Sequence, residues 1–245
     1  VVQTPVAFLT CNFTQPLDGK PALLTHDDVI TLFHEFGHGI HHLLSLVEEP
    51  SVTGISGVPW DAVELPSQFL ENWCWERDAL DLLTSHVDTG EALPDKLLQK
   101  LRGARNFQSG MQMVRQLEFA LFDFRLHAST TLISADAILR VLDDVRQQVA
   151  VVTPPSFDRF PHAFSHIFAG GYAAGYYGYL WSEVLSADAY DRFEQEGVFN
   201  ATAGRAFMQH VLETGGVEEP LDVFKAFRGR EPSINAFLRH SGLNT

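Results

Sequence analysis

Cysteine is scarce in this sequence of 245 residues, which contains only Cys11 and Cys74. The two cysteines lie far apart, so their spacing excludes a disulfide framework and a zinc knuckle, and we expect Cys74 to be a small buried side chain. The sequence also lacks a run of roughly 18 apolar residues that could cross a membrane and a secretory signal at its start. We therefore expect a protein of the reducing cytoplasm that does not bind membranes.

Positive charge is also in short supply. The chain has 17 Lys and Arg residues against 31 Asp and Glu residues, which gives a formal net charge of −14. Such a charge repels phosphate backbones, so we exclude nucleic acid as a partner and favour a neutral or cationic ligand. Hydrophobic residues make up 45% of the chain, with 19 Phe among them. This content is enough to fill the core of one large domain or two small ones.

Helical patterns dominate the chain, and strand-forming residues are confined to its beginning. β-Branched and aromatic residues at 5–14 lead into the turn-prone stretch TQPLDGKP and predict a small β element near the N-terminus. The first helix begins at a capping box of Thr25 and Asp28, and the Pro- and Gly-containing loop 48–60 follows it. The sequence predicts a mainly α fold with helices near 25–47, 61–86, 92–108, 110–131, 135–149, 176–195, 202–213, 220–228 and 233–240.

The stretch THDDVITLFHEFGHGIHHLL, residues 25–44, places His34 and His38 four residues apart in the predicted helix. Residues at this spacing share one helical face, so the two imidazoles point toward one place. Glu35 lies one step around the helix, where its carboxylate can reach a water activated by a metal. In the competing interpretation the segment is a helix with a polar stripe that binds no metal, because the same five-residue pattern also occurs by chance. A metal site requires a third ligand.

The third ligand is expected beyond the loop that follows this helix. A metzincin would need a histidine six residues after His38, but position 44 is Leu, so that class is excluded. A glutamate on the next helix is the other arrangement, and Glu64 in WDAVELPSQFLENW is the best-placed acid. A carboxylate there can instead complement a helix dipole, and Glu71 is the second candidate ligand. The polar residues that can orient the imidazoles are Ser67, Gln68 and Glu71.

Tyrosine is concentrated in the segment FPHAFSHIFAGGYAAGYYGYLWSEV, residues 160–184. Of the five tyrosines in the chain, four fall within eight residues: Tyr172, Tyr176, Tyr177 and Tyr179. We predict that Tyr172, Tyr176 and Tyr179 lie on one helical face, with glycines that let the backbone approach a ligand. An aromatic stripe packed in a core is the competing interpretation. Buried phenols usually need a hydrogen-bond partner, which favours a binding role.

Four motifs occur in order along the chain: HEFGH, ELPSQFLENWCWE, FSHIFAGGYAAGYYGYLW and FRGREP. They resemble the thimet oligopeptidase family (M3) of zinc metallopeptidases, and the resemblance extends from about Asn12 to Leu243. It implies a zincin-type helical catalytic domain with one Zn²⁺ ion per chain. It also implies a deep channel that admits short peptides and excludes folded proteins.

The family's functional residues fall on matching positions of this sequence. The resemblance places the metal ligands on His34, His38 and Glu64, and the substrate-binding residues on His166, Tyr172, Tyr176 and Tyr179. His41 matches a further family position. Metal-assisted hydrolysis then assigns Glu35 as general base. A phenol of Tyr179 or Tyr172 stabilises the oxyanion, and His166 shares this role or binds the peptide backbone.

The chain begins with strand-like residues and without Met. We expect residues 1–245 to be the C-terminal catalytic region of a longer metallopeptidase, whose preceding part completes the channel. The active-site helices are expected at about 25–84 and the substrate-binding segment at about 160–184. The expected function is zinc-dependent endopeptidase cleavage of short oligopeptides. Two alternatives remain: a dipeptidyl carboxypeptidase of the same family, which the loop GISGVPWDAVELPSQF disfavours, and a zinc-binding fragment with little activity alone.

Overall fold

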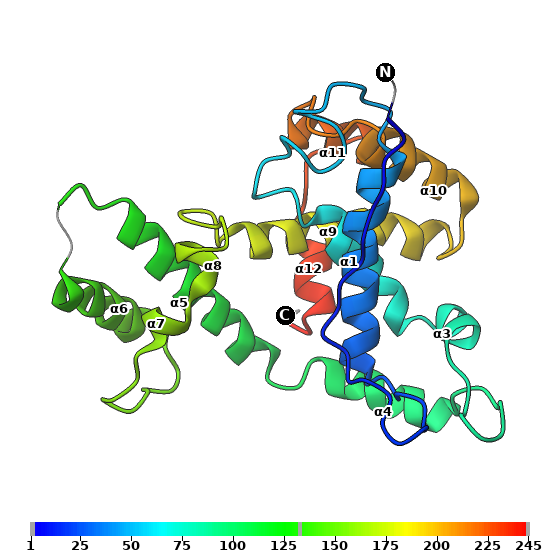
Figure 1. The fold of residues 1–245 in the computed structure, drawn as a ribbon, viewed down its shortest axis with the longest axis horizontal. Helices are drawn as coiled ribbons and strands as arrows, with labels where there is room; N and C mark the ends of the chain where they lie inside the picture. Colours follow the sequence, from blue (N-terminus) through cyan, green and yellow to red (C-terminus); the bar gives the residue numbers. More distant parts are fainter. Residues whose placement is uncertain (1–2, 132–133, 244–245) are drawn as a thin grey trace.

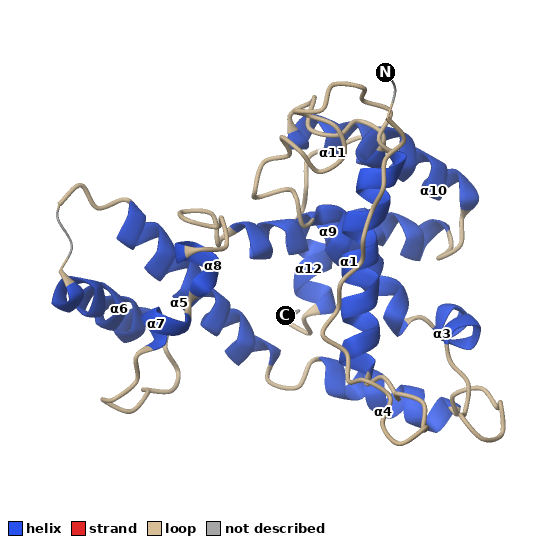
Figure 2. Ribbon diagram, viewed as in Figure 1, coloured by secondary structure: helices blue, strands red, loops and turns tan. Residues whose placement is uncertain are grey.

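The computed structural model describes residues 3–131 and 134–243, and the regular structure in them is helical (Figure 2). This confirms the predicted mainly α fold. The α-helices are α1 (His26–Leu44), α2 (Leu65–Glu71), α3 (Arg77–Leu83), α4 (Asp95–Arg105), α5 (Ser109–His127), α6 (Ala135–Val149), α7 (Phe160–Ala163), α8 (Ser165–Phe168), α9 (Gly178–Glu196), α10 (Ala201–Phe207), α11 (Pro220–Arg228) and α12 (Asn235–His240). A 3₁₀ helix, η1 (Asn72–Trp75), and a π-helical turn, η2 (Met208–Leu212), complete the set.

The predicted β element at residues 5–14 is not confirmed. In the described ranges the only β pairing is an isolated antiparallel bridge between Leu17 and Lys20. Residues 5–14 instead run alongside α1 (Figure 1), where a Cβ atom added to Gly39 would lie 3.0 Å from the Leu9 side chain. A strand requires a neighbouring strand to satisfy its backbone groups, and this segment lies beside a helix, whose backbone groups bond within the helix.

Helix α1 begins as the sequence predicts. The Asp28 N–H donates to the Thr25 hydroxyl oxygen at 3.2 Å, and the Thr25 N–H donates to the Asp28 carboxylate at 2.8 Å. The two bonds form a capping box that satisfies N–H groups otherwise left free at the helix start. Helix α1 ends at Leu44, a little before the predicted limit, and its middle carries the HEFGH motif.

The predicted single helix at 61–86 is wrong, because three short helical elements occupy this range. Pro66 lies in the first turn of α2, where a missing N–H costs nothing. The chain tightens into η1 after Glu71, and Glu76 adopts an extended conformation (φ −92°, ψ 132°) that separates η1 from α3. Glu64 therefore stands immediately before α2 rather than inside a long helix.

Of three hydrophobic clusters in the described residues, two position the site, and the third joins α9 to α12. The larger one joins α2, α9, α10 and α11, with Phe69, Phe193, Phe207 and Phe224 buried at its centre. The second joins α5 and α6 to the α7–α8 region, and its buried members include Phe122, Leu142, Phe164 and Tyr176. Figure 1 shows the elements of the second cluster gathered on one side of the molecule, with α9 leading from them toward the larger cluster. The tyrosine-rich segment lies at this junction.

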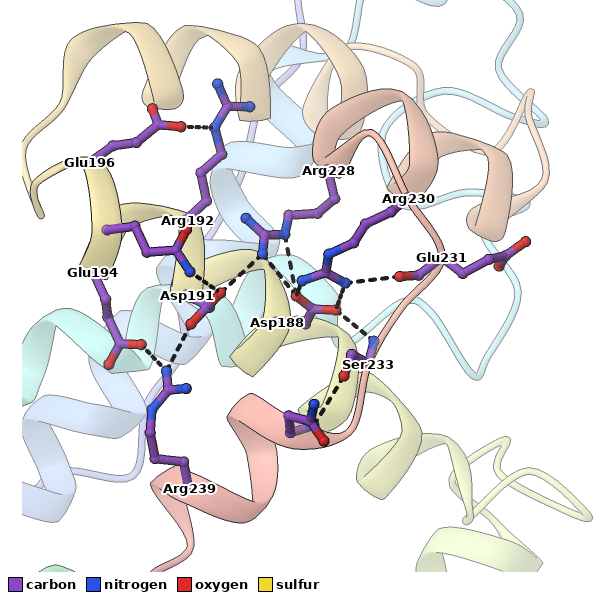
Figure 3. Close-up of polar contacts among 12 residues, drawn as sticks. Asp188, Asp191, Arg192, Glu194, Glu196, Arg228, Arg230, Glu231, Ser233 and Arg239 are labelled. Atoms are coloured by element: carbon purple, nitrogen blue, oxygen red, sulfur yellow. Dashed lines mark hydrogen bonds and ion pairs between the residues drawn. The ribbon is translucent and has the colours of Figure 1, made fainter. Parts of the chain in front are cut away.

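A charged network attaches the FRGREP segment to α9 (Figure 3). The Asp188 carboxylate is 1% exposed. It accepts hydrogen bonds from Arg228 at 3.2 Å, from Arg230 at 2.7 Å and from the backbone N–H of Ser233 at 2.6 Å. Charge-assisted bonds of this kind are shorter and stronger than neutral ones. The network fixes the start of the C-terminal segment, and with it α12, against the helix that follows the tyrosines.

None of the helices in the described part of the chain combines the length and apolar character needed to cross a membrane.

Candidate metal centre

Three side chains converge between α1 and α2. The His34 Nε2 atom lies 3.3 Å and the His38 Nε2 atom 3.1 Å from the same carboxylate oxygen, Oε2 of Glu64. The three candidate ligand atoms lie within 4.8 Å of one another, and together they form the group in the described residues that could hold a metal ion. Two imidazoles and one carboxylate are a donor set suited to a divalent ion with one coordination position left open.

Close packing of the two helices brings these groups together. A Cβ atom at Gly37, inside the HEFGH motif, would lie 2.5 Å from the Pro66 carbonyl oxygen and 2.5 Å from the Ser67 Cα atom. Such separations are impossible for a real side chain, so only glycine allows α1 to approach α2 this closely. Glu64, directly before α2, is thereby placed under the two histidines.

The surroundings of Glu64 favour its ionised form. Its side chain is 3% exposed, and burial alone would raise its pKa. Hydrogen bonds with His34, His38 and Tyr172 outweigh burial and hold the pKa of Glu64 well below its usual range. The Ser67 hydroxyl donates to Oε2 at 2.9 Å, and the Tyr172 hydroxyl donates to Oε1 at 2.5 Å. A buried carboxylate with this environment stabilises positive charge placed beside it.

His34 is oriented from its far side. Its Nδ1 atom lies 2.7 Å from Oε1 of Glu71. Since a carboxylate can only accept, Nδ1 carries the proton and Nε2 is left to face Glu64. Burial lowers the pKa of His34, but the hydrogen bonds of Glu64 and Glu71 outweigh it and raise the pKa to about 10. The site therefore favours a cation at this position, either a proton or a metal ion.

The other predicted residues of this region have distinct positions. Glu35 is partly exposed next to His34, and in the described residues no hydrogen bond engages its carboxylate. The Gln68 amide donates to the Tyr179 carbonyl oxygen at 3.2 Å. His41 is 3% exposed with no hydrogen-bond partner among the described residues. Burial and the neighbouring histidines lower its pKa to about 4. Burial likewise raises the pKa of the Cys74 thiol to about 12.

Tyr172 and Tyr179 lie at the metal centre, but the three tyrosines predicted to share one helical face do not do so. That prediction is wrong, because α9 begins only at Gly178 and Tyr172 lies in the preceding loop. The Tyr172 and Tyr179 rings stack with centroids 4.7 Å apart. Tyr176 is 9% exposed and its hydroxyl donates to Gln116 at 3.0 Å. The structure therefore brings Tyr172 and Tyr179 beside Glu64 and places Tyr176 in the second hydrophobic cluster.

The phenols beside Glu64 remain protonated at neutral pH. Burial and the hydrogen bond to Glu64 raise the pKa of Tyr172, and burial raises the pKa of Tyr179 as well. Both hydroxyls therefore keep a hydrogen to donate, and Tyr172 directs its hydrogen at Glu64 in this structure. His166 is exposed, and its ring centroid lies 6.2 Å from that of Tyr179. Tyr177 is turned away from this group and donates to Asp61 at 2.8 Å.

A cavity of about 500 Å³ adjoins the metal centre. The residues that line it include Glu71, His166, Tyr179, Glu183 and Arg105. Burial, followed by the charge of Glu71, raises the pKa of Glu183 to about 7, while the charge of Arg105 acts in the opposite direction. The cavity is therefore lined both by charged side chains and by residues expected to contact a substrate.

Trp60 belongs to the site but was not predicted. Its ring lies 4.6 Å from that of Tyr172, and a Cβ atom at Gly171 would lie 3.1 Å from it. The indole therefore supports the tyrosine that contacts Glu64. In the sequence Trp60 is a single aromatic residue at the end of a loop, and no spacing rule distinguishes it.

Comparisons with known proteins identify a matching family and several similar proteins. The model of peptidase family M3 matches residues 1–243. The chain is 61% identical over 242 residues to oligopeptidase A of Salmonella typhimurium and to oligopeptidase A of Escherichia coli, covering 99% of this chain and 36% of each relative. It is 37% identical over 245 residues to dipeptidyl carboxypeptidase of Escherichia coli, covering 98% of this chain and 35% of that protein. The chain thus spans about a third of the length of these relatives.

Proposed function

Since the chain belongs to peptidase family M3, a family of metallopeptidases, we propose that residues 1–245 carry the catalytic region of a zinc-dependent endopeptidase. The proposed substrates are short oligopeptides. The observation that supports this most directly is the convergence of His34, His38 and Glu64 beside an unengaged Glu35. The proposed fold of this region is of the zincin type, and the proposed compartment is the cytoplasm, where Cys11 and Cys74 would stay reduced.

His34, His38 and Glu64 would hold one Zn²⁺ ion per chain. Imidazole nitrogens and a carboxylate oxygen are ordinary zinc ligands, and the Glu71 carboxylate at Nδ1 of His34 is a common outer partner. When bound, zinc polarises a carbonyl group and lowers the pKa of a coordinated water. The chain itself supplies the ionised Glu64, the orientation of His34 and the close packing that keeps the donors together.

Glu35 is the proposed general base. Its carboxylate would take a proton from the water as the oxygen attacks the scissile carbonyl carbon. The same carboxyl group would then give this proton to the nitrogen of the departing amine as the C–N bond breaks. The base returns to its ionised form at the end of the cycle, so no further reagent is required.

Tyr172 and Tyr179 are the proposed donors to the oxyanion that forms on the carbonyl oxygen. Both phenols stay protonated; the Tyr172 hydroxyl donates to Oε1 of Glu64 at 2.5 Å in this structure and would turn from this carboxylate to the oxyanion. One such donor contributes on the order of 3 kcal/mol to transition-state stabilisation. His166, exposed at the cavity, would share this role or bind the peptide backbone, and the ring of Tyr176 would form part of the cavity wall.

A dipeptidyl carboxypeptidase is the second candidate. Arg105 lines the cavity, and its guanidinium group, stacked 4.7 Å from the Trp75 ring, has no carboxylate within salt-bridge distance among the described residues. A cation in this place could bind the terminal carboxylate of a peptide. The higher identity to oligopeptidase A than to dipeptidyl carboxypeptidase supports the endopeptidase instead.

The experiment uses an internally quenched fluorescent peptide with both termini blocked, incubated with the zinc-loaded protein. An endopeptidase cleaves it at internal bonds, which mass spectrometry locates. A dipeptidyl carboxypeptidase cleaves only the matched peptide with a free carboxyl end. Cleavage of neither, with stoichiometric zinc bound, would support a zinc-binding unit whose substrate channel requires the rest of a longer protein. A chain extended toward the N-terminus of the parent protein would then show the higher kcat/KM.

A further inference from the structure

The loop at residues 169–177, which joins α8 to α9, contains two residues with positive φ angles. Gly171 has φ 88°, and Ala174 has φ 57°. Glycine adopts such values freely, but a residue with a Cβ atom loses about 1–2 kcal/mol in the left-handed region. Contacts from elsewhere in the molecule must therefore hold Ala174 in place.

The contacts come from a buried carboxylate in the middle of α5. Asp123 is 1% exposed. Its Oδ1 atom accepts the backbone N–H of Ala174 at 2.9 Å, and its Oδ2 atom accepts the backbone N–H of Tyr176 at 2.9 Å. The Nδ1 atom of His127, one turn further along α5, lies 2.7 Å from Oδ1. Both carboxylate oxygens are thus occupied by the loop. The His127 Nδ1 atom also forms a hydrogen bond with the backbone carbonyl oxygen of Asp123 at 3.0 Å, so the imidazole is held against the carboxylate.

The opposite side of the same loop reaches the metal centre. The Tyr172 hydroxyl donates to Glu64 at 2.5 Å, and the Trp60 ring packs on Tyr172 and against Gly171. The loop therefore extends between two buried carboxylates, Glu64 at the metal centre and Asp123 on α5. Only Ala173 separates Tyr172 from Ala174, the residue whose N–H is bound by Asp123, so a displacement at Asp123 is expected to shift Tyr172.

We infer that Asp123, oriented by His127, is a positioning residue that fixes the tyrosine loop against the metal centre. The part of this inference that concerns turnover rests on the proposed peptidase function. The geometry requires a carboxylate, since two N–H donors converge on it. Asparagine would offer one acceptor oxygen and turn an NH₂ group toward the second donor.

The test compares Asp123→Asn with Glu118→Gln in the zinc-loaded protein. Glu118 is a matched control because it is also a buried carboxylate of α5, at 2% exposed, but it pairs with Arg115 and Arg146 rather than with the loop. Both variants lose a buried charge and should unfold at lower temperature. Hydrogen exchange of the Ala174 and Tyr176 amides is measured alongside kcat and KM on a quenched peptide.

The expected result is specific to the loop. Asp123→Asn should lose protection at the Ala174 and Tyr176 amides and lower kcat/KM by about 10- to 100-fold, mainly through kcat. Glu118→Gln should retain both. Unchanged protection in Asp123→Asn would overturn the inference, and so would lost protection with unchanged kcat/KM in an active enzyme. If neither this chain nor one extended toward the N-terminus of the parent protein hydrolyses a peptide, the proposed function fails, while exchange at the two amides still decides whether Asp123 holds the loop.

A second variant keeps the test decisive if Asp123→Asn does not fold. His127 is partly exposed, with 28% of its side chain accessible, so His127→Gln should fold. Its expected effect has the same direction and is smaller: faster exchange at the two amides and a kcat/KM lowered by a few-fold. Wild-type exchange and wild-type kcat/KM in His127→Gln would contradict the role of the Asp123–His127 pair.

Discussion

The two halves of the candidate site are held by different kinds of structure. His34 and His38 belong to α1, whose own hydrogen bonds fix their spacing and whose contact with α2 fixes Glu64 beneath them. Tyr172 belongs to a loop whose shape depends on Glu64 at one side and Asp123 at the other. The metal half is therefore sensitive to the loss of its own ligands. The tyrosine half is sensitive to groups that need not touch a substrate.

The largest expected effect separates metal binding from catalysis within the first half. Replacing His34, His38 or Glu64 by Ala should abolish stoichiometric zinc, because two ligands do not retain the ion. Glu35→Gln should keep zinc and lower kcat by about 10²- to 10⁴-fold, because it removes the general base. Metal analysis of dialysed protein and turnover of a quenched peptide measure the two effects. Normal zinc content in Glu64→Ala would move the third ligand elsewhere, with Glu71 the next candidate.

A smaller effect is expected in the tyrosine half. Tyr172→Phe removes a single hydroxyl, and loss of one oxyanion donor lowers kcat by about 10²- to 10³-fold. Tyr177→Phe is the control from the same segment, since its hydroxyl donates to Asp61 instead. It should leave kcat unchanged. Steady-state kinetics with measured zinc content distinguish the two variants. Equal kcat values for Tyr172→Phe and the wild type would assign the oxyanion donor to Tyr179 or His166.

The metal half could be predicted from sequence because its geometry is that of a single helix. The capping box and the four-residue spacing of the histidines are consequences of helix geometry, and the structure has the box and brings Glu64 beside both imidazoles. The predicted helix at 61–86 failed because hydrophobic periodicity does not reveal the extended residue Glu76, which separates η1 from α3. The predicted β element failed because strand propensity says nothing about whether a partner strand lies nearby.

The tyrosine half could not be predicted in the same way. Its tyrosines were identified by their clustering, but their arrangement follows from left-handed backbone at Gly171 and Ala174 rather than from helical spacing. Asp123 gave only a weak signal, an acid within the apolar run FALFDFRL. Its backbone partner Ala174 lies 51 residues further along the chain. No local pattern contains a pairing of this length.

The third prediction concerns the packing of α1 against α2, which holds the metal half together. Gly37→Ala would place a Cβ atom 2.5 Å from the Pro66 carbonyl oxygen, so α1 and α2 must separate. We expect a loss of about 1–3 kcal/mol in the free energy of unfolding, together with weaker zinc binding because Glu64 moves away from the histidines. Gly103→Ala in α4 is the control, with no atom within 4 Å of the added Cβ. It should be neutral or stabilising, by up to about 1 kcal/mol. Urea unfolding and zinc titration measure both quantities, and wild-type zinc affinity in Gly37→Ala would contradict the role of this contact.

The smallest expected effect concerns Glu183, which lines the same cavity as Glu71. Its pKa is raised to about 7, above the 4.5 of an unperturbed carboxyl, by burial and then by the charge of Glu71. The folded state therefore binds this proton more tightly than the unfolded state between about pH 4.5 and 7. The contribution to stability is fully present below this window and is lost as the pH rises through it. Because Glu183 is nevertheless exposed to solvent, screening reduces the effect to on the order of 1 kcal/mol. In metal-free protein, Glu183→Gln should have the same free energy of unfolding as the wild type at pH 4.5 and a higher one at pH 8.

Glu218→Gln, at an exposed position outside the cavity, changes the net charge by the same amount and controls for it. Urea midpoints across this range measure the difference. Parallel pH profiles for Glu183→Gln and Glu218→Gln would show that the charge of Glu183 does not lower the free energy of unfolding at high pH.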